Sequence, residues 1–255
     1  MRRPAGRALP ALSLPALSPP ARLFAAEALG LFVYVLVGAG TEAGVRAAAA
    51  RVGAPLGADA YLLIGLAHGF ALFTATIFTH NVSGAHVNPA VTVGLASAGR
   101  FPWRGVPVQV AGQALGGMLG AAAIPLVLGR TRALRGDVGA AVIAPHVSLI
   151  QGLVIEALGT AVLMLTILAT SGDPRAPAGW DALAAGMSVV PVTMVLAPAT
   201  SALVNPARAF GPELVLRILG GHADWTVFVV MDVVGPLLGA LVACRAYRAI
   251  AGRRG

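Results

Sequence analysis

The chain contains no lysine, a single cysteine and few charged residues of either sign. Of its 255 residues only 11% are charged and 57% are hydrophobic, with a mean hydropathy of +0.82, beyond the range of soluble domains. One cysteine, Cys244, excludes an intramolecular disulfide and a cysteine-built metal site. Because the five histidines are scattered without paired spacing, we expect no metal and no cofactor. The scarcity of charge therefore indicates a membrane protein.

Apolar stretches recur along the chain at the length that crosses a bilayer, roughly 20 residues. They cover residues 22–43, 59–79, 104–128, 147–170, 181–200 and 224–245. An even number of spans predicts that both termini lie on the same side of the membrane.

All 18 basic residues are arginine, and the formal charge of +8 could suggest nucleic acid as a partner. In the six-span arrangement, however, eleven arginines share a side with the termini, while Arg208 falls in a segment that does not span. The other side has Arg46, Arg51, Arg130, Arg132, Arg135 and Arg217. This bias predicts cytoplasmic termini by the positive-inside rule, with the lipid bilayer as partner and no nucleic acid.

Residues 1–21 resemble a signal peptide in having Arg2 and Arg3 before an apolar stretch. Four prolines would break its helix, so we expect a disordered cytoplasmic tail. The alternative, a cleaved signal, would place the mature N-terminus outside, against the arginine bias. Arginine without lysine, together with abundant alanine, glycine and proline, favours a GC-rich bacterial source and therefore the plasma membrane.

The sequence also contains an internal repeat. Residues 26–30 (AEALG) match 155–159 (IEALG), 109–112 (QVAG) match 232–235 (DVVG), and Asn88-Pro89-Ala90 recurs as Asn205-Pro206-Ala207. We interpret residues 22–250 as one domain with repeat one at 22–128 and repeat two at 147–250. Each repeat has three spans, so the second must enter the membrane inverted.

Each Asn-Pro-Ala stretch reads as a helix start, because asparagine is a favoured cap and proline a favoured first residue. The helices, running to about Ala98 and Leu219, would cross half a bilayer. Their positive N-terminal ends then meet near the midplane, where they disfavour cations but admit a neutral dipole such as water. We expect each asparagine oxygen to cap its own helix and each amide to donate into the passage.

Glu27 and Glu156 are carboxylates at matching positions of the first and fourth predicted spans. Ionisable residues in spans are candidates for a proton relay, but the symmetric placement of this pair favours accepting backbone N–H groups of the two re-entrant loops. Glycines spaced four apart, at 112, 116 and 120 and at 235 and 239, predict close helix packing between the two halves. Gly65 and Gly69 are a weaker instance of the same pattern.

The stretches 83–92 (SGAHVNPAVT) and 205–212 (NPARAFGP) closely resemble the aquaporin, or major intrinsic protein, family. The resemblance covers residues 22 to 250. It implies an all-α membrane fold of six transmembrane helices and two re-entrant half-helices arranged as an inverted repeat, with a pore in each subunit of a homotetramer.

The resemblance also implies a selectivity filter of His68, Thr193, Ala202 and Arg208. A histidine at the first position is similar to plant tonoplast intrinsic proteins, and Val192 is an alternative to Thr193 because Pro191 and Pro198 flank it.

Three positions of the motif region bear on subclass. Ala209 matches water channels, whereas Glu213 and Asp232 depart from the family pattern. A carboxyl at position 232 would have to be protonated or paired with a donor.

We therefore expect a passive channel for water, with ammonia, hydrogen peroxide and urea as further candidate solutes, that excludes protons and ions. A secondary transporter also has inverted repeats and broken helices, but it should place coupling carboxylates where Asn88 and Asn205 stand. An intramembrane enzyme has the least support, because no span pairs a nucleophile with a base.

Overall fold

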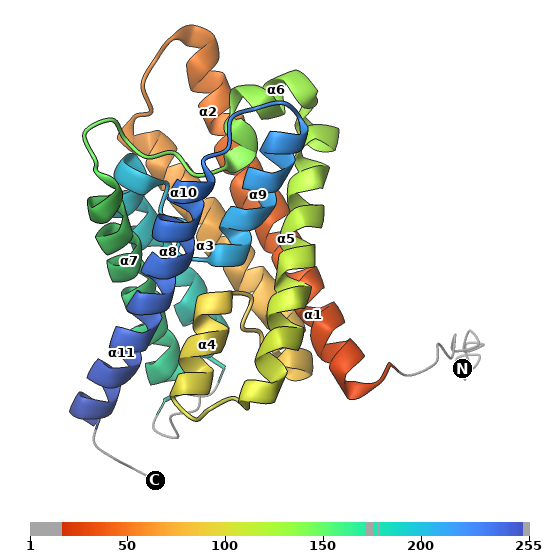
Figure 1. Ribbon diagram of the computed structural model, residues 1–255, viewed down its shortest axis with the longest axis vertical. Coiled ribbons are helices and arrows are strands. Elements are labelled where there is room, and N and C mark those ends of the chain that lie inside the picture. The colour runs from red at the N-terminus through yellow and green to blue at the C-terminus, as the bar shows by residue number, and fades with distance from the viewer. Residues whose placement is uncertain (1–16, 172–175, 178, 252–255) are drawn as a thin grey trace, which may run out of the picture.

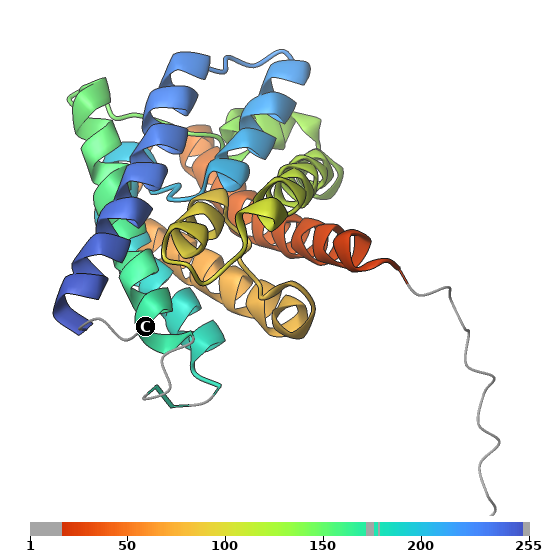
Figure 2. The same ribbon diagram turned by 60° about the horizontal axis from the view of Figure 1, so that its bottom comes forward.

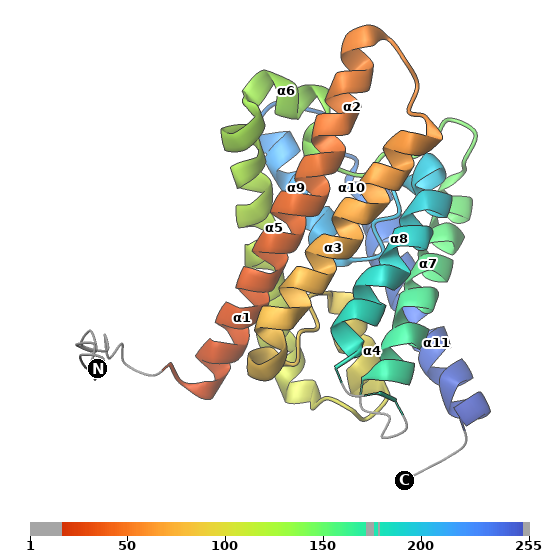
Figure 3. The ribbon, with the colours of Figure 1, turned by 180° about the vertical axis from the view of Figure 1, so that it is seen from behind.

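The computed structural model describes residues 17–171, 176–177 and 179–251. Within them the chain is helical, without strands, and six helical segments are long and apolar enough to cross a membrane. These segments are Pro19–Val52, Ala58–Ser83 (α3), Trp103–Leu128, Leu149–Thr170 (α7), Asp181–Thr200 (α8) and Trp225–Ala251. Figures 1 and 3 show them packed side by side along the long axis. The all-α architecture predicted from the sequence is confirmed.

Three of the spans are composite. The first joins α1 (Pro19–Tyr34), the π-helical turn η1 (Val35–Ala39) and α2 (Gly40–Val52). The third begins with a short 3-10 turn, η2 (Trp103–Gly105), and continues as α5 (Val106–Leu128). The sixth joins α10 (Trp225–Val227), a second π-helical segment, η4 (Phe228–Val234), and α11 (Gly235–Ala251). Between α5 and α7 lie α6 (Arg130–Arg135) and η3 (Asp137–Gly139).

The two half-helices enter the bundle from opposite ends. α4 (Pro89–Ser97) lies in the lower half of Figure 1, the end at which α1 begins and α11 ends, here named the terminal face. α9 (Pro206–Ile218) lies in the upper half, near α2 and α6, at the opposite face. Figure 2, viewed toward the terminal face, shows α4 surrounded by the long helices. Both half-helices end one residue before the predicted limit.

The first span begins earlier than predicted. α1 starts at Pro19, with Pro20 in its first turn, where a missing N–H costs no helical hydrogen bond. Residues 19–21 of the predicted tail are therefore helical. Residues 17 and 18 precede the helix, and residues 1–16 of that predicted tail lie outside the described part of the chain.

The glycines spaced four apart in α5 and α11 do not join the two halves, which corrects the prediction for these two helices. A Cβ on Gly116 would lie 2.1 Å from the carbonyl oxygen of Ala28, so this glycine presses α5 against α1 inside the first half. Gly239 meets Ala157 in the same way, also at 2.1 Å, pressing α11 against α7 inside the second half. The spacing identified a close-packed face but not the helix that packs there.

Gly69, from the weaker instance of the pattern, and glycines outside the pattern make the contact between the halves. A Cβ on Gly69 of α3 would lie 2.8 Å from the carbonyl oxygen of Gly186 in α8, and the reverse distance is 2.5 Å. Gly117 of α5 and Gly211 of α9 approach equally closely, at 2.4 Å from the Ala207 oxygen and 2.2 Å from the Gly117 oxygen. Backbone therefore packs on backbone at both junctions, which is how helices associate in lipid.

Gly116→Ala should destabilise the protein, because the added methyl has to push α5 away from α1. We expect a loss of about 1–3 kcal/mol in the free energy of unfolding, the usual cost of overpacking. Gly44→Ala is the matched control, because a Cβ on Gly44 would have a Leu128 methyl at 4.0 Å as its nearest neighbour. Alanine is more stable than glycine inside a helix by up to about 1 kcal/mol, so this variant should not lose stability. Thermal unfolding in detergent measures both; equal melting temperatures would contradict the packing argument.

Candidate functional site

Two loops of irregular backbone lead into the half-helices and repeat each other's geometry. Val87 and Val204 have φ of 48° and 43°, in the left-handed region. The residues two before them, Ala85 and Ala202, have φ of 53° and 50°. Left-handed backbone is strained for a β-branched residue, at about 1–3 kcal/mol for each such residue. Surrounding contacts must therefore hold both loops.

Glu27 supplies those contacts for the first loop. Its Oε1 accepts from Ser83 Oγ at 2.6 Å and from the His86 backbone N–H at 3.1 Å. Its Oε2 accepts from the Val87 N–H at 2.8 Å and from Gln113 Nε2 at 2.6 Å. A fully buried carboxylate is thus surrounded by four donors, which satisfies loop amides that have no helical hydrogen bond.

Glu156 does the same for the second loop. It accepts from Thr200 Oγ1 at 2.6 Å and from the N–H groups of Leu203 and Val204 at 3.1 and 2.7 Å. Its partners lie 117 residues after those of Glu27, the spacing of the two Asn-Pro-Ala stretches. In both places the carboxylate oxygens point to loop donors, an arrangement that suits a loop support better than a proton relay.

Asn88 and Asn205 cap the half-helices as their residue types predict. Asn88 Oδ1 accepts from the Ala90 N–H at 2.8 Å, and Asn205 Oδ1 accepts from the N–H groups of Ala207 and Arg208 at 3.1 and 3.2 Å. Pro89 and Pro206 occupy the first helical position in each case. The caps bring the two positive helix ends to the centre of the bundle.

The asparagine amides also join the two loops, which the sequence did not predict. Asn88 Nδ2 donates to the Val204 carbonyl at 2.9 Å, and Asn205 Nδ2 donates to the Val87 carbonyl at 2.7 Å. A carboxamide has two donors, so this exchange uses one N–H of each side chain. The second N–H of each amide is the one available to a molecule in the passage.

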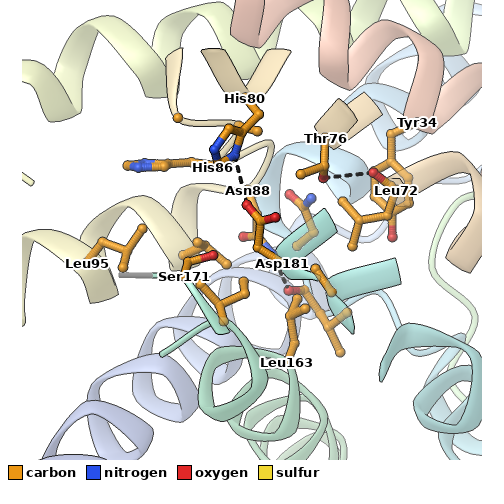
Figure 4. A pocket seen from close by; sticks show the side chains of 17 residues that line it. Tyr34, Leu72, Thr76, His80, His86, Asn88, Leu95, Leu163, Ser171 and Asp181 are labelled. Carbon is orange, nitrogen blue, oxygen red and sulfur yellow. Dashed lines mark hydrogen bonds and ion pairs between the residues drawn. The ribbon is translucent and has the colours of Figure 1, made fainter. Parts of the chain in front are cut away.

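A cavity opens from the asparagines toward the terminal face (Figure 4). Asn88 and Asn205 line its inner end, with Tyr34, Leu72 and Leu163 among the walls. His80 and Asp181, which also line it, are joined by a contact of 2.9 Å between Nδ1 and Oδ2. A second cavity lies toward the opposite face and is lined by residues that include Glu42, Arg46, Tyr61 and Ser201.

The four predicted filter residues line neither cavity, and all four are buried. The structure brings two of them into direct contact: Arg208 Nη2 lies 3.2 Å from His68 Nε2. His68 Nδ1 faces the Ile64 carbonyl at 3.0 Å, so Nδ1 has to carry the hydrogen and Nε2 is left to accept from Arg208. A Cβ on Gly38 would lie 2.7 Å from the His68 ring, so the π-helical turn η1 makes room for the imidazole.

Arg208 is fully buried and held by three groups. Nη1 donates to the Gly139 carbonyl at 2.7 Å, Nε donates to His68 Nε2 at 3.4 Å, and Nη2 forms an ion pair with Glu42. The sequence analysis did not identify Glu42 as part of this site. The available signal was a carboxylate inside the first span, fifteen residues after Glu27.

Thr193 and Ala202 complete the predicted set. α8 runs unbroken through Pro191 and Pro198, and the Thr193 hydroxyl is buried without a hydrogen-bond partner among the described residues. Val192 is also buried. Ala202 precedes Asn205 in the left-handed loop and is 5% exposed.

The two departures from the family pattern have different surroundings. Glu213 accepts from the Ala141 N–H at 3.0 Å, which fixes the loop between α5 and α7 to α9. Neither carboxyl oxygen of Asp232 in η4 has a hydrogen-bond partner among the described residues. Gln109, which matches Asp232 in the repeat, donates to the Ser83 carbonyl at 2.9 Å. The second repeat therefore has the carboxyl group of Asp232 at the position where the first repeat has the side-chain amide of Gln109.

The chain is similar to known proteins over nearly its whole length. The family model described as Major intrinsic protein matches residues 17–247. Aquaporin AqpM of Methanothermobacter marburgensis is 35% identical over 233 residues, which cover 88% of this chain and 94% of the relative. Probable aquaporin AqpM of Archaeoglobus fulgidus is 34% identical over 241 residues, covering 91% and 97%.

A solved structure supports the same fold. The aquaglyceroporin from Plasmodium falciparum superimposes with a TM-score of 0.80 at 24% identity, covering 91% of this chain and 97% of that one. The family match, the archaeal relatives and the six spans with two half-helices agree. The chain therefore belongs to the major intrinsic protein (aquaporin) family of multi-pass membrane channels.

Proposed function

We propose that this channel conducts water through each subunit and excludes protons and ions. One observation carries the proposal: Asn88 and Asn205 meet where two half-helix N-termini converge, at the inner end of a cavity that opens to the terminal face. Positive helix ends repel hydronium and metal cations, whereas water can turn its oxygen toward the free asparagine amides. A water that accepts from both amides points its hydrogens away, which interrupts a proton wire.

The filter of His68, Thr193, Ala202 and Arg208 selects by size and polarity in this proposal. His68 lies on α3 between Ile64, which lines the cavity toward the opposite face, and Leu72, which lines the cavity toward the terminal face, and the filter side chains are polar except for Ala202. Ammonia, hydrogen peroxide and urea are further candidate solutes because they are small, neutral and able to hydrogen-bond. Glu27 and Glu156 act as loop supports, through the contacts with the strained backbone described above.

The family supports the assembly that we propose, and the arginine bias supports the orientation. We propose a homotetramer in a bacterial plasma membrane, with the terminal face toward the cytoplasm. A secondary transporter is the second candidate function, and the inverted repeat is the feature that supports it. The central positions carry neutral amides rather than carboxylates that could bind a coupling ion.

Purified protein in proteoliposomes should accelerate osmotic shrinkage measured by stopped-flow light scattering, without moving protons. An uncoupler added to the same vesicles should leave the water flux unchanged, since a passive channel uses no ion gradient. Isotonic gradients of urea and glycerol measure the solute range in parallel. Water flux equal to that of empty liposomes, with the protein inserted and folded, would contradict the proposal.

His68→Ala should widen the filter, because it removes the ring that contacts Arg208 and leaves space beside Gly38. Urea and glycerol permeability should rise several-fold relative to water. His222→Ala, which removes an exposed histidine outside the passage, is the matched control and should leave the ratio unchanged. An unchanged ratio in correctly folded His68→Ala would remove His68 from the filter.

Water flux should resist mercurials in the unmodified protein. The only thiol, Cys244, is buried in α11 and donates to the Gly94 carbonyl of α4 at 3.3 Å. Ala202→Cys should create mercury sensitivity, because it places a thiol in the filter. Inhibition of the unmodified protein that a reducing agent reverses and Cys244→Ser abolishes would place Cys244 beside the water path.

A further inference from the structure

A buried carboxylate in the first span connects two guanidinium groups. Glu42 of α2 is 1% exposed, and it forms ion pairs with Arg46 through Oε1 and with Arg208 through Oε2. His68 Nε2 lies 3.9 Å from the same Oε2. A carboxylate in this position contacts the filter as directly as the predicted filter residues contact each other.

The contacts of Arg208 leave it little freedom to move. Its three nitrogens all end on protein acceptors, namely the Gly139 carbonyl, His68 and Glu42. Of these three, Glu42 is the one with a full negative charge. A charge-assisted bond to a buried carboxylate is stronger and more directional than a bond to a carbonyl or to a neutral imidazole. Glu42 therefore dominates where the guanidinium lies.

Arg46 lies on the outer side of this pair. It lines the cavity toward the opposite face, is 13% exposed, and donates to Ser201 Oγ at 2.7 Å and to the Ala140 carbonyl at 2.8 Å. Its charge is thus next to the outer cavity and anchored to loop atoms, whereas the charges of Glu42 and Arg208 face each other in the buried interior. The buried Glu42–Arg208 pair is therefore neutral, and the charge of Arg46 lies at the cavity toward the opposite face.

We propose that Glu42 is a fifth, specificity-determining residue of the filter, which positions Arg208 and cancels its charge so that the filter selects neutral solutes without attracting anions. This inference rests on the proposed channel function and deepens it. Exclusion of cations then depends on the half-helix ends at Asn88 and Asn205, and exclusion of anions depends on Glu42. An arginine without a buried counter-ion would instead make the filter a site for small anions.

The test compares Glu42→Gln, Arg46→Gln and the double variant in proteoliposomes. Glu42→Gln keeps the size of the side chain but removes the charge, so nitrate permeability relative to water should rise about tenfold, because the charge of Arg208 is no longer compensated. Arg46→Gln keeps the Glu42–Arg208 pair and should not raise the ratio. The double variant has the same net charge as the unmodified protein, yet it should conduct nitrate as Glu42→Gln does.

Two readouts separate this inference from the proposed function. Water flux of the unmodified protein tests the channel, whereas the nitrate-to-water ratio of the double variant tests Glu42; a ratio at the unmodified level would overturn the inference even if water flux is high. Thermal unfolding in detergent measures how much the ion pair contributes to stability, independently of any transport assay. Glu42→Gln should lower the melting temperature more than Arg46→Gln does, because it leaves two guanidinium groups uncompensated. The reverse order would also overturn the inference.

Discussion

The structure depends on two buried carboxylates that satisfy backbone N–H groups at the centre of a membrane. Lipid offers no hydrogen bonds, so non-helical backbone survives at that depth only where protein or a water path satisfies it. Glu27 and Glu156 provide this for loops whose valines adopt left-handed backbone. The half-helices can begin at the midplane because these loops are held there. The caps at Asn88 and Asn205, and the helix dipoles behind them, follow from that support.

The passage separates two kinds of discrimination in space. At the asparagines the field comes from helix ends, which involves no ionised side chain and requires no counter-ion. At the filter an ionised arginine is present, and its charge has to be balanced within a few ångströms or it costs several kcal/mol. Glu42 meets that requirement. In the proposed channel one constriction thus works through backbone dipoles and the other through a neutralised ion pair, so a change at one need not alter the other.

Local patterns in the sequence were sufficient for most of the fold. Six apolar stretches predicted the spans, and the Asn-Pro pairs predicted both half-helices to within one residue at their C-terminal ends. Each of these signals lies within a short window. The start of the first span was placed three residues late, because a proline inside a tail and a proline in the first turn of a helix look alike.

What could not be predicted depends on residues far apart in the chain. Gly116 belongs to a face suited to close packing, but the pattern does not say whether α1 or a helix of the other half packs there. Glu42 and Arg208 are separated by 166 residues, and nothing local to either identifies the other. The exchange between Asn88 and Val204 is equally remote. The four filter residues were predicted from the resemblance to the family, whereas the contacts between them were known only from the structure.

The exchange of asparagine hydrogen bonds has a consequence for biosynthesis. The first re-entrant loop obtains its Glu27 contacts from residues made within a short interval, but Asn88 finds the Val204 carbonyl only after the ribosome has added more than a hundred residues. Until then α4 has a polar side chain with no partner from the second half, beside helices already in the bilayer. The second re-entrant loop therefore completes the hydrogen bonds of both loops at once, and a chain that stops before residue 204 lacks the acceptor for Asn88.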